Sequence, residues 1–456
     1  MEDSKEKTKG HKKKNNHAII IGGSIAGCLA AEVLSPYFDK VTLLEKGDFE
    51  DEVHPRKSVP QERHIHVLLQ KGEKIMERIF PNLMHDLKAE GAVNVNLGQD
   101  IEWFQYGLWK KRCDMNFESH FFSRRLLDNC IRRRIRQNTK IRIQSQSSVE
   151  DFIFSVNEKE ETTVVGVKIH TLTGITCLHG NLVVDARGLG SQTPNLLKSA
   201  GLGEVYKEKI KTNLGYVTRL YKRDPQSTER TIVVWSTPPK EKALGLMLPI
   251  ENDRWMVSVG GWFNQFPKPE SEDFLNYTRT ILPVSNIYDR IKDLEPLDDI
   301  VRYRLPYAEW RHFEKLAKFP DGLLVIGAAL CTTNPFYGQG MTLCAIQAEL
   351  IQSTISGWIK GRYPTHYIQS SFTKIVQFSW DMAKTEDLRF PEIIGRRTPF
   401  ITFKQWYSKK FARIAALTPF ARKMQLDIIH MIKPTYWAFH PLIIIQMILF
   451  YFKRIK

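Results

Sequence analysis

The segment AIIIGGSIAGCLAAEVLSPYFDKVTLLE, residues 18–45, constrains the fold of this chain more than any other. Its pattern predicts a buried strand, a glycine-rich turn, a helix of small residues and a second buried strand. Gly22 allows the tight turn after the first strand, and Gly27 allows the helix to pack close to the sheet. These parts together are typical of a dinucleotide-binding βαβ unit. A glycine-rich turn that binds nothing is the alternative.

Two side chains of this segment fit a bound nucleotide. Glu45 ends the second strand, 23 positions after Gly22, where a carboxylate can accept hydrogen bonds from both hydroxyls of an adenosine ribose. Ser24 replaces the middle glycine of a GxGxxG motif, and its small side chain still permits a close approach of the backbone. The N-terminus of the predicted helix offers amide groups and the positive end of its dipole to a pyrophosphate.

The length of 456 residues is more than one hydrophobic core usually supports, and it predicts two or three lobes. The six cysteines form no CxxC pair and no cluster with histidine at metal-ligand spacing. We therefore expect free thiols, a reducing cytoplasmic location and no structural metal. Residues 1–16 are rich in lysine and lack the apolar core of a secretory signal, so they predict a disordered basic tail.

The formal net charge of +16 indicates either an acidic partner or a set of solvated basic surfaces. Basic residues gather in three places: the N-terminal tail, residues 132–136 on a predicted helix, and residues 396–423. No nucleic-acid-binding module is recognisable, so we expect no nucleic-acid partner. Attraction to an anionic membrane surface and ordinary solvated faces fit the other clusters equally well.

Farther along the chain, pieces of a nucleotide-binding fold alternate with sheet-rich segments. Short strands at about ten-residue spacing within 211–262 predict an antiparallel sheet. Hydrophobic periodicity predicts helices and buried strands over the following residues: helices over 72–80, 123–136 and 339–358, and strands over 101–109, 141–149, 164–170, 182–185 and 323–326.

Three further motifs indicate a flavin rather than another dinucleotide. LVVDARGLGS, residues 182–191, is similar to a DAxGxxS motif and contains Gly188. LLVIGAALCTTNPFYGQGMTLCAIQA, residues 323–348, is similar to GDAxxxxxPxxGxGxxxA. SRRLLD, residues 123–128, is similar to a helix start whose arginine, here Arg124, contacts the cofactor. Together these motifs resemble the FAD-dependent monooxygenases with a glutathione-reductase-like fold.

This resemblance implies an α/β fold, in which a Rossmann-like FAD-binding domain is interleaved with an antiparallel-sheet substrate domain and followed by a helical C-terminal segment. It implies non-covalent FAD and no metal. The cofactor-binding residues implied are Gly22, Ser24, Gly27, Glu45, Arg124, Gly188, Gly327, Pro335, Gly338 and Gly340. The expected boundaries are a tail over 1–16, FAD-binding parts over 17–60, 116–205 and 316–360, substrate-domain parts over 61–115 and 206–315, and the helical segment over 361–456.

One position departs from the flavin motif. The aspartate that follows Gly327 in the motif, where it binds the ribityl chain, is Ala328 here. Losing a charge-assisted hydrogen bond costs on the order of 1.5–3 kcal/mol of affinity. We therefore expect weaker FAD binding, and a flavin-free relative stays an alternative.

A narrower resemblance rests on RKSVPQERHIHVLLQKG (56–72), LPIENDRWMVSVGG (248–261) and WDMAKTEDLRFPEIIG (380–395). These segments are similar to bacterial polyether epoxidases of the lasalocid and monensin type. That resemblance implies epoxidation or hydroxylation of a small apolar organic substrate: NAD(P)H binds transiently and reduces the flavin, O2 forms a C4a-hydroperoxide, and the substrate takes its distal oxygen.

No catalytic residue follows from this resemblance, and the oligomeric state is not predicted. A flavin-dependent reductase of isoprenoid-like substrates and a non-catalytic, lipid-binding relative stay open. A flavin-dependent halogenase is disfavoured because the motif WxWxIP is missing, with Leu246, Leu248 and Ile250 in the comparable run.

Two further groups of side chains are ambiguous. His64 and His66 alternate along an extended stretch and so share a face. A loop against the flavin explains them better than a metal site or an acid–base pair. Aromatic residues of the predicted sheets fit either an apolar pocket or ordinary packing; these are Trp103, Phe104, Tyr106, Trp235, Trp255 and Trp262.

The chain ends in an apolar stretch. Residues 434–452 carry no formally charged side chain, close to the ~20 residues of a transmembrane helix, and basic residues flank them. Tyr436, Trp437 and Tyr451 suit a lipid headgroup region, whereas Pro441 and Gln446 disfavour a clean span. We therefore expect an anchor that lies at the membrane surface or re-enters it. A transmembrane anchor and a helix packed on the protein are the alternatives.

Overall fold

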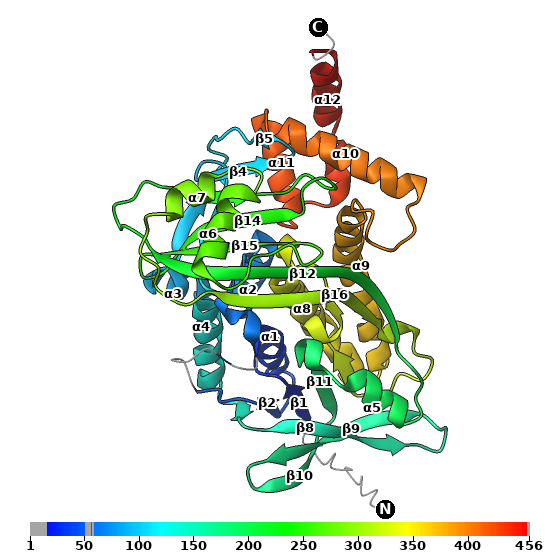
Figure 1. The fold of residues 1–456 in the computed structure, drawn as a ribbon. Helices are drawn as coiled ribbons and strands as arrows, with labels where there is room; N and C mark the ends of the chain where they lie inside the picture. Colours follow the sequence, from blue (N-terminus) through cyan, green and yellow to red (C-terminus); the bar gives the residue numbers. More distant parts are fainter. Residues whose placement is uncertain (1–15, 51–55, 57–58, 454–456) are drawn as a thin grey trace, which may run out of the picture.

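The structure is a computed structural model, and it describes residues 16–50, 56 and 59–453 (Figure 1). Residues 1–15 of the tail predicted over 1–16, and the basic residues Arg454 and Lys456, therefore lie outside the described residues. The architecture comprises a parallel sheet, a larger mixed sheet and a helical C-terminal end, as predicted.

A five-stranded parallel sheet with the order β17-β11-β1-β2-β7 forms the lower layer in Figure 1. Its central strands are buried because the helix Ile25–Leu34 and the strand Thr162–Thr171 of a small antiparallel sheet both pack against it. The β1–β2 and β1–β11 pairings confirm the predicted βαβ unit. The strands are β1 (His17–Ile21), β2 (Lys40–Leu44), β7 (Ile141–Gln144), β11 (Leu182–Asp185) and β17 (Leu323–Val325).

Helices α1 and α8 pack against one another beside this sheet, and α4 and α9 pack next to them. The small residues of α1 permit this close packing, and eight of its ten residues are buried. The helices of this layer are α1 (Ile25–Leu34), α2 (Gln70–Ile79), α3 (Leu83–Ala89), α4 (Arg124–Gln137), α5 (Thr193–Ser199), α8 (Gly340–Ile359) and α9 (Thr365–Asp387).

The larger sheet has eight strands in the order β18-β16-β12-β15-β14-β13-β4-β5, antiparallel except for the β13–β4 pair. Its long strands β12 (Tyr206–Lys222) and β16 (Val301–His312) cross the middle of the molecule in Figure 1, and their register shifts between Lys211 and Leu214. The others are β4 (Ile101–Gln105), β5 (Leu108–Trp109), β13 (Thr231–Val234), β14 (Ala243–Ile250), β15 (Arg254–Gly261) and β18 (Cys331–Thr332).

Smaller elements complete these two layers. α6 and α7 pack on the larger sheet around Trp255 and Phe274, and two small sheets flank the parallel sheet and the β4 region. Their bounds are α6 (Ser271–Thr280), α7 (Asn286–Ile291), β3 (Val93–Asn96) paired with β6 (Glu118–Phe121), and the sheet of β8 (Ser148–Val156), β9 (Thr162–Thr171) and β10 (Gly174–His179).

The C-terminal end has its own small core. α10 (Pro399–Ala415), α11 (Pro419–Ile429) and α12 (Pro441–Lys453) meet around Tyr407, Phe411 and Ile443. The apolar stretch 434–452 is therefore not one helix, because a short 3-10 helix, η6 (Thr435–Phe439), precedes α12. Across the described ranges, no helix has the length and apolar character needed to cross a membrane.

Candidate functional site

The first glycine turn is shaped by close backbone contacts. Gly22 has a φ of +105°, and a Cβ there would lie 2.8 Å from the carbonyl oxygen of Ala186 on the turn after β11. A Cβ on Gly27 would lie 1.7 Å from the carbonyl oxygen of Gly22. A side chain at position 27 would therefore push α1 off the turn, which is the close helix–strand approach predicted for this glycine.

Arg124 lies against this turn; its expected contact with the cofactor stays a prediction. Its guanidinium donates a hydrogen bond to Ser24 Oγ at 3.0 Å and another to Asp128 Oδ2 at 3.0 Å. Arg56 also donates to Asp128 and reaches the Gly23 carbonyl. Burial raises the pKa of the Asp128 carboxyl, but the Arg124 and Arg56 charges outweigh it and hold that pKa below its ordinary value.

Sequence reasoning did not assign Asp128 or Arg56 a role, although both lie in the motifs that carry the resemblance. The available signal was the four-residue spacing of Arg124 and Asp128, which places them on one helix face. Both charges of the Asp128 pair are buried, so the ion pair fixes the Arg124 side chain against the glycine turn.

Glu45 lies beside the same turn. One carboxylate oxygen accepts the Gly23 amide at 2.7 Å, and the other accepts the Gly47 amide at 2.9 Å. The carboxylate therefore orders the turn and the end of β2. Ribose recognition by Glu45 stays a prediction.

The second and third glycine motifs meet each other at the carboxyl ends of β11 and β17. Gly188 has a φ of +69°, and Ala328 Cβ lies 4.0 Å from the position that a Cβ would take there. Gly327, with a φ of +60°, lies against both helices: a Cβ there would be 2.9 Å from Ala26 Cβ and 3.4 Å from Cys344 Sγ. The predicted glycine turns thus converge between α1 and α8. The part of the site that is expected to bind the adenosine lies outside this meeting point.

Small, solvent-exposed residues line this meeting point. Gly190, Ala328 and Gly340 are exposed, and a Cβ at Gly190 or Gly340 would touch nothing. α1 and α8 both begin here, with no side-chain cap and no acidic residue in the first turn of either helix. Their first amides can therefore bind an anion. The residues fit a dinucleotide, with the single departure of Ala328.

The turn between Pro335 and Gly340 is held from the other side by α9. Pro335 begins a short 3-10 helix, η5 (Pro335–Tyr337), and Gly338 ends it with a φ of +68°. Asp387 Oδ1 accepts three hydrogen bonds. The donors are Asn334 Nδ2 at 2.9 Å, the Tyr337 hydroxyl at 3.1 Å and Trp262 Nε1 at 3.1 Å.

Asp387 is fully buried, and its Oδ2 atom has no hydrogen-bond partner among the described residues. Burial raises the pKa of this carboxyl to about 7, even though three donors oppose the shift. No role could be predicted for Asp387 from the sequence, because nothing local distinguishes it from the neighbouring acids.

The two ambiguous histidines are both neutral near pH 7. Burial lowers the pKa of His64 to about 3, and its Nδ1 bonds the Thr218 hydroxyl at 2.7 Å. Burial, together with the Arg124 charge, lowers the pKa of His66 to about 4. Within the described ranges no group of three metal-binding side chains occurs. The interpretation as loop residues near the site is the one that this geometry favours.

The aromatic residues divide between both interpretations. Trp255 is buried in the core under α6 and α7, which is ordinary packing. Trp262 instead packs edge-on against Phe336 of η5, with ring centroids 5.0 Å apart, and Trp235 lies 6.1 Å from Tyr337. A pocket lined by all six predicted aromatics is therefore wrong, because Trp255 belongs to the packed core.

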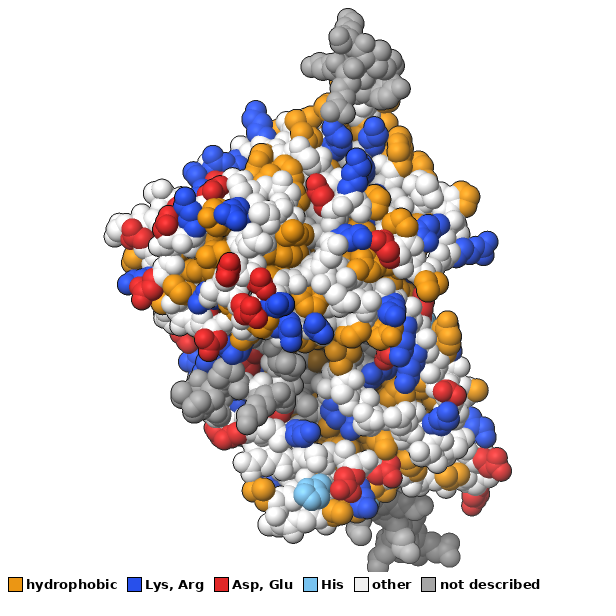
Figure 2. Space-filling model, viewed as in Figure 1, with side chains coloured by type: hydrophobic (Ala, Val, Ile, Leu, Met, Phe, Trp, Pro, Cys, Tyr) orange, Lys and Arg blue, Asp and Glu red, His pale blue; other side chains and the backbone are white. Residues whose placement is uncertain are grey.

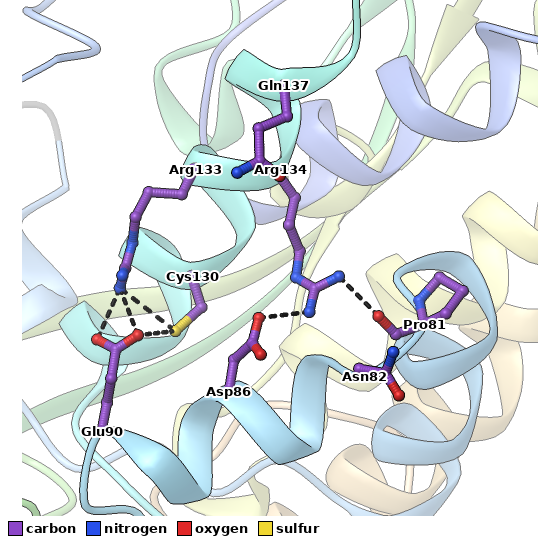
Figure 3. Close-up of a pocket in the computed structure, with 8 residues that line it drawn as sticks. All are labelled: Pro81, Asn82, Asp86, Glu90, Cys130, Arg133, Arg134 and Gln137. Atoms are coloured by element: carbon purple, nitrogen blue, oxygen red, sulfur yellow. Dashed lines mark hydrogen bonds and ion pairs between the residues drawn. The ribbon is translucent and has the colours of Figure 1, made fainter.

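The basic cluster over 132–136 is paired within the protein. In the pocket of about 280 Å3 between α3 and α4, Arg133 binds Glu90 and Arg134 binds Asp86 (Figure 3). Arg132 is buried over the Phe49 ring. Ion pairs thus offset part of the charge of this cluster, and its attraction to anionic lipid stays a prediction.

Solved structures of flavin-dependent enzymes have a similar overall fold. The flavin-dependent brominase Bmp2 matches with a TM-score of 0.57 and 17% identity over 90% of each chain. The p-nitrophenol 4-monooxygenase PnpA from Pseudomonas putida DLL-E4 matches with a TM-score of 0.61 and 14% identity over 91% of this chain and 98% of that one. The chain has the flavin-dependent monooxygenase fold. The fold class expected from the motifs is thereby confirmed.

Comparison of the sequence with known proteins supports less than the comparison of structures does. Protein Rv3254 of Mycobacterium tuberculosis is 27% identical over 349 residues, which cover 73% of this chain and 71% of that protein. No family model matches the chain. The narrower resemblance to polyether epoxidases stays a prediction.

Proposed function

We propose that this chain binds FAD and uses it to oxygenate a small apolar organic substrate. The observation that carries the proposal is the meeting of Gly188 with two exposed small residues, Ala328 and Gly340, at two uncapped helix N-termini. Exposed small residues beside uncapped amides fit a ligand better than they fit packing. The flavin-dependent fold supports the choice of FAD among dinucleotides.

Different residues would bind different parts of FAD. The amides at the start of α1 and the Arg124 guanidinium would hold the pyrophosphate, and Glu45 would accept the adenosine ribose hydroxyls. The turn from Pro335 to Gly340 and the start of α8 would hold the flavin ring. FAD bound there would supply oxidation–reduction chemistry, with NAD(P)H as the reductant and O2 as the source of the oxygen atom given to the substrate, its second atom leaving as water.

The side of the site toward the larger sheet is aromatic, which supports an apolar substrate. Tyr216 of β12 lies 5.4 Å from Tyr303 of β16 and 5.8 Å from Phe336 of η5, measured between ring centroids. His64 packs edge-on against Tyr216 at 4.8 Å. These rings make the side of the turn that faces the sheet apolar. Aromatic faces pack on alkenes and rings but offer few hydrogen bonds.

Asp387 has a positioning role in this proposal. The neutral carboxylic acid holds a proton at Oδ2 up to about pH 7, and its Oδ1 fixes the Asn334 and Tyr337 side chains. Ionising it would leave a buried charge against the turn that carries the flavin ring. The proton on Asp387 therefore keeps this turn in place.

Ala328 supports a second candidate, a non-catalytic relative that binds lipid or another ligand without flavin. An alanine leaves the ribityl chain without its usual acceptor at this position. A flavin-dependent reductase of isoprenoid-like substrates uses the same FAD contacts and consumes no oxygen. The products of the reaction, and not the residues that bind FAD, therefore distinguish epoxidation, hydroxylation and reduction.

The test uses the purified full chain reconstituted with FAD. We expect the protein to oxidise NADH or NADPH, to consume O2 when an apolar alkene is present, and to release an epoxide or an alcohol. Product formation without O2 uptake would favour the reductase. Failure to bind FAD at any concentration would favour the flavin-free relative.

A further inference from the structure

The C-terminal helix α12 has apolar side chains on two opposite faces. Ile443 is fully buried against α10 and α11, and Met447 and Phe450 pack beside it. The opposite face exposes Leu442, Ile444, Ile445, Ile448 and Leu449 by 39–57%. The one polar side chain within 441–450, Gln446, is used internally, because its Oε1 accepts a hydrogen bond from Thr418 at 2.9 Å. A helix that is apolar all round is expected to be covered.

Helix α10 adds exposed aromatic rings at the same end of the molecule. Phe400, Phe403 and Trp406 are exposed by 63%, 45% and 55%. α12 projects beyond α10 at the top of Figure 1. More than half of the large apolar side chains that are exposed in the described part of the chain lie between Ile394 and Leu449. A patch of this size marks a binding surface; we name these exposed residues of α10 and α12 the C-terminal face.

The charge around the C-terminal face is strongly positive. Residues 394–450 contain nine lysines and arginines, of which Arg422 is buried. They contain one acidic residue, Asp427, which is paired with Lys423 and Lys433. Blue and orange side chains accordingly gather at this end of the molecule in Figure 2. Lys404 lies 4.4 Å from the Phe400 ring, so basic and aromatic groups alternate on the surface.

We propose that the C-terminal face docks the protein on the surface of an anionic lipid bilayer. The exposed side chains of α12 and α10 would enter the boundary between headgroups and acyl chains, and the lysines and arginines would contact anionic headgroups. The thirteen residues of α12 span only ~20 Å at ~1.5 Å per residue, against the ~30 Å of a bilayer core. The helix therefore lies in the interface and does not cross.

Charge distinguishes this occupant from a second copy of the chain. Two copies that met through the C-terminal face would bring two strongly basic surfaces together, and their repulsion would oppose pairing. An anionic bilayer complements the same charge. The apolar and the electrostatic observations therefore favour one partner.

The test is co-sedimentation of the full chain with phosphatidylcholine vesicles, with and without phosphatidylglycerol. We expect binding to the anionic vesicles that weakens without phosphatidylglycerol and at high salt. The double variant Ile445→Asn/Leu449→Asn should lower the affinity by at least about tenfold, because it removes two inserted side chains. Phe403→Ser/Trp406→Ser on α10 should lower it in the same way.

Truncation before η6 is a poor variant, because Ile443 and the Ala438 carbonyl belong to the folded C-terminal core. The matched control is Leu172→Asn/Ile175→Asn, which alters two exposed residues at the opposite end of the molecule. It should leave vesicle binding unchanged. Equal thermal unfolding midpoints of all variants would show that the fold is retained.

Two results would overturn the proposal. One is binding to anionic vesicles that the α12 and α10 variants do not weaken. The other is a concentration-dependent dimer, seen by sedimentation velocity, that the same variants dissociate while vesicle binding is absent. In that case a second copy covers the C-terminal face.

Discussion

The guanidinium of Arg124 donates a hydrogen bond to Ser24 Oγ across 3.0 Å, joining two segments that lie one hundred residues apart in the sequence. This contact connects the start of α4 to the turn that begins α1. The Asp128 carboxylate holds the arginine in place from the other side. A fixed positive charge is thereby built into the turn at which a pyrophosphate would bind.

Arg124→Gln should weaken FAD binding by about tenfold or more, because a charge-assisted hydrogen bond contributes on the order of 1.5–3 kcal/mol. Quenching of FAD fluorescence on titration measures the affinity. Arg134→Gln is the matched control on the same helix, since Arg134 pairs with Asp86 on the surface. Equal FAD affinity in the Arg124 variant and the control would mean that Arg124 is a structural residue.

Gly340→Val should separate folding from FAD binding. A side chain at Gly340 meets nothing within 4 Å, so we expect an unchanged unfolding midpoint. The same side chain would occupy the start of α8, and FAD affinity should fall at least about tenfold as the close backbone approach is lost. Gly27→Ala should instead fail to fold, because its Cβ would lie 1.7 Å from the Gly22 carbonyl oxygen. Normal FAD binding by Gly340→Val would place the flavin elsewhere.

Ala328→Asp should tighten FAD binding, because it restores an acceptor at the position that the flavin motif uses for the ribityl chain. The expected gain is on the order of 1 kcal/mol or more. Ala328 is exposed, so the carboxylate can be accommodated without displacing a neighbour. The measurement is an FAD titration of apo-protein beside Ala328→Ser. If the aspartate variant binds FAD no better than the serine variant, the ribityl site has been remodelled.

Asp387 should make the protein less stable as pH rises. Its carboxyl has a pKa of about 7 when folded, against an ordinary 3.8, so the folded state binds the proton more tightly than the unfolded state does. The free energy of unfolding should therefore fall between about pH 4 and pH 7 and stay low above that range. Asp387→Asn, which keeps the Oδ1 acceptor, should remove this dependence.

Chemical denaturation at pH 4 and pH 8 measures this effect. Asp387→Asn should match the wild type at pH 4 and exceed it by up to about 4 kcal/mol at pH 8, since one pKa unit corresponds to about 1.4 kcal/mol. Asp381→Asn, an exposed position on the same helix, is the control. The contradicting result is a free energy of unfolding that rises from pH 4 to pH 8 by the same amount in the wild type and in both variants. That result would show that Asp387 is ionised when folded.

Local patterns in the sequence predicted most of the fold. The glycines, the apolar strands and the helix over 123–136 predicted β1, α1, β2, α4 and β11 because each depends on neighbours within a few residues. Gly27 is an example: its spacing from Gly22 already implied the close contact that the structure has.

The contacts that depend on distant segments could not be predicted. Asp387 on α9 reaches Asn334 and Trp262, which are separated from it by 53 and 125 positions, and no local pattern marks such a partner. The basic residues over 132–136 were ambiguous for the same reason, because their partners lie on α3 and on the segment after β2. The C-terminal stretch was ambiguous because its uncharged length resembles a span, whereas η6 and Pro441 divide it.

The central claim is that the three glycine turns hold FAD, and the visible absorption spectrum of the purified full chain tests it most directly. The protein is measured as isolated and again after incubation with excess FAD and removal of free flavin. We predict the two visible bands of an oxidised flavin bound at one FAD per chain, and release of the yellow colour on acid precipitation. A spectrum without these bands after incubation with FAD would contradict the account.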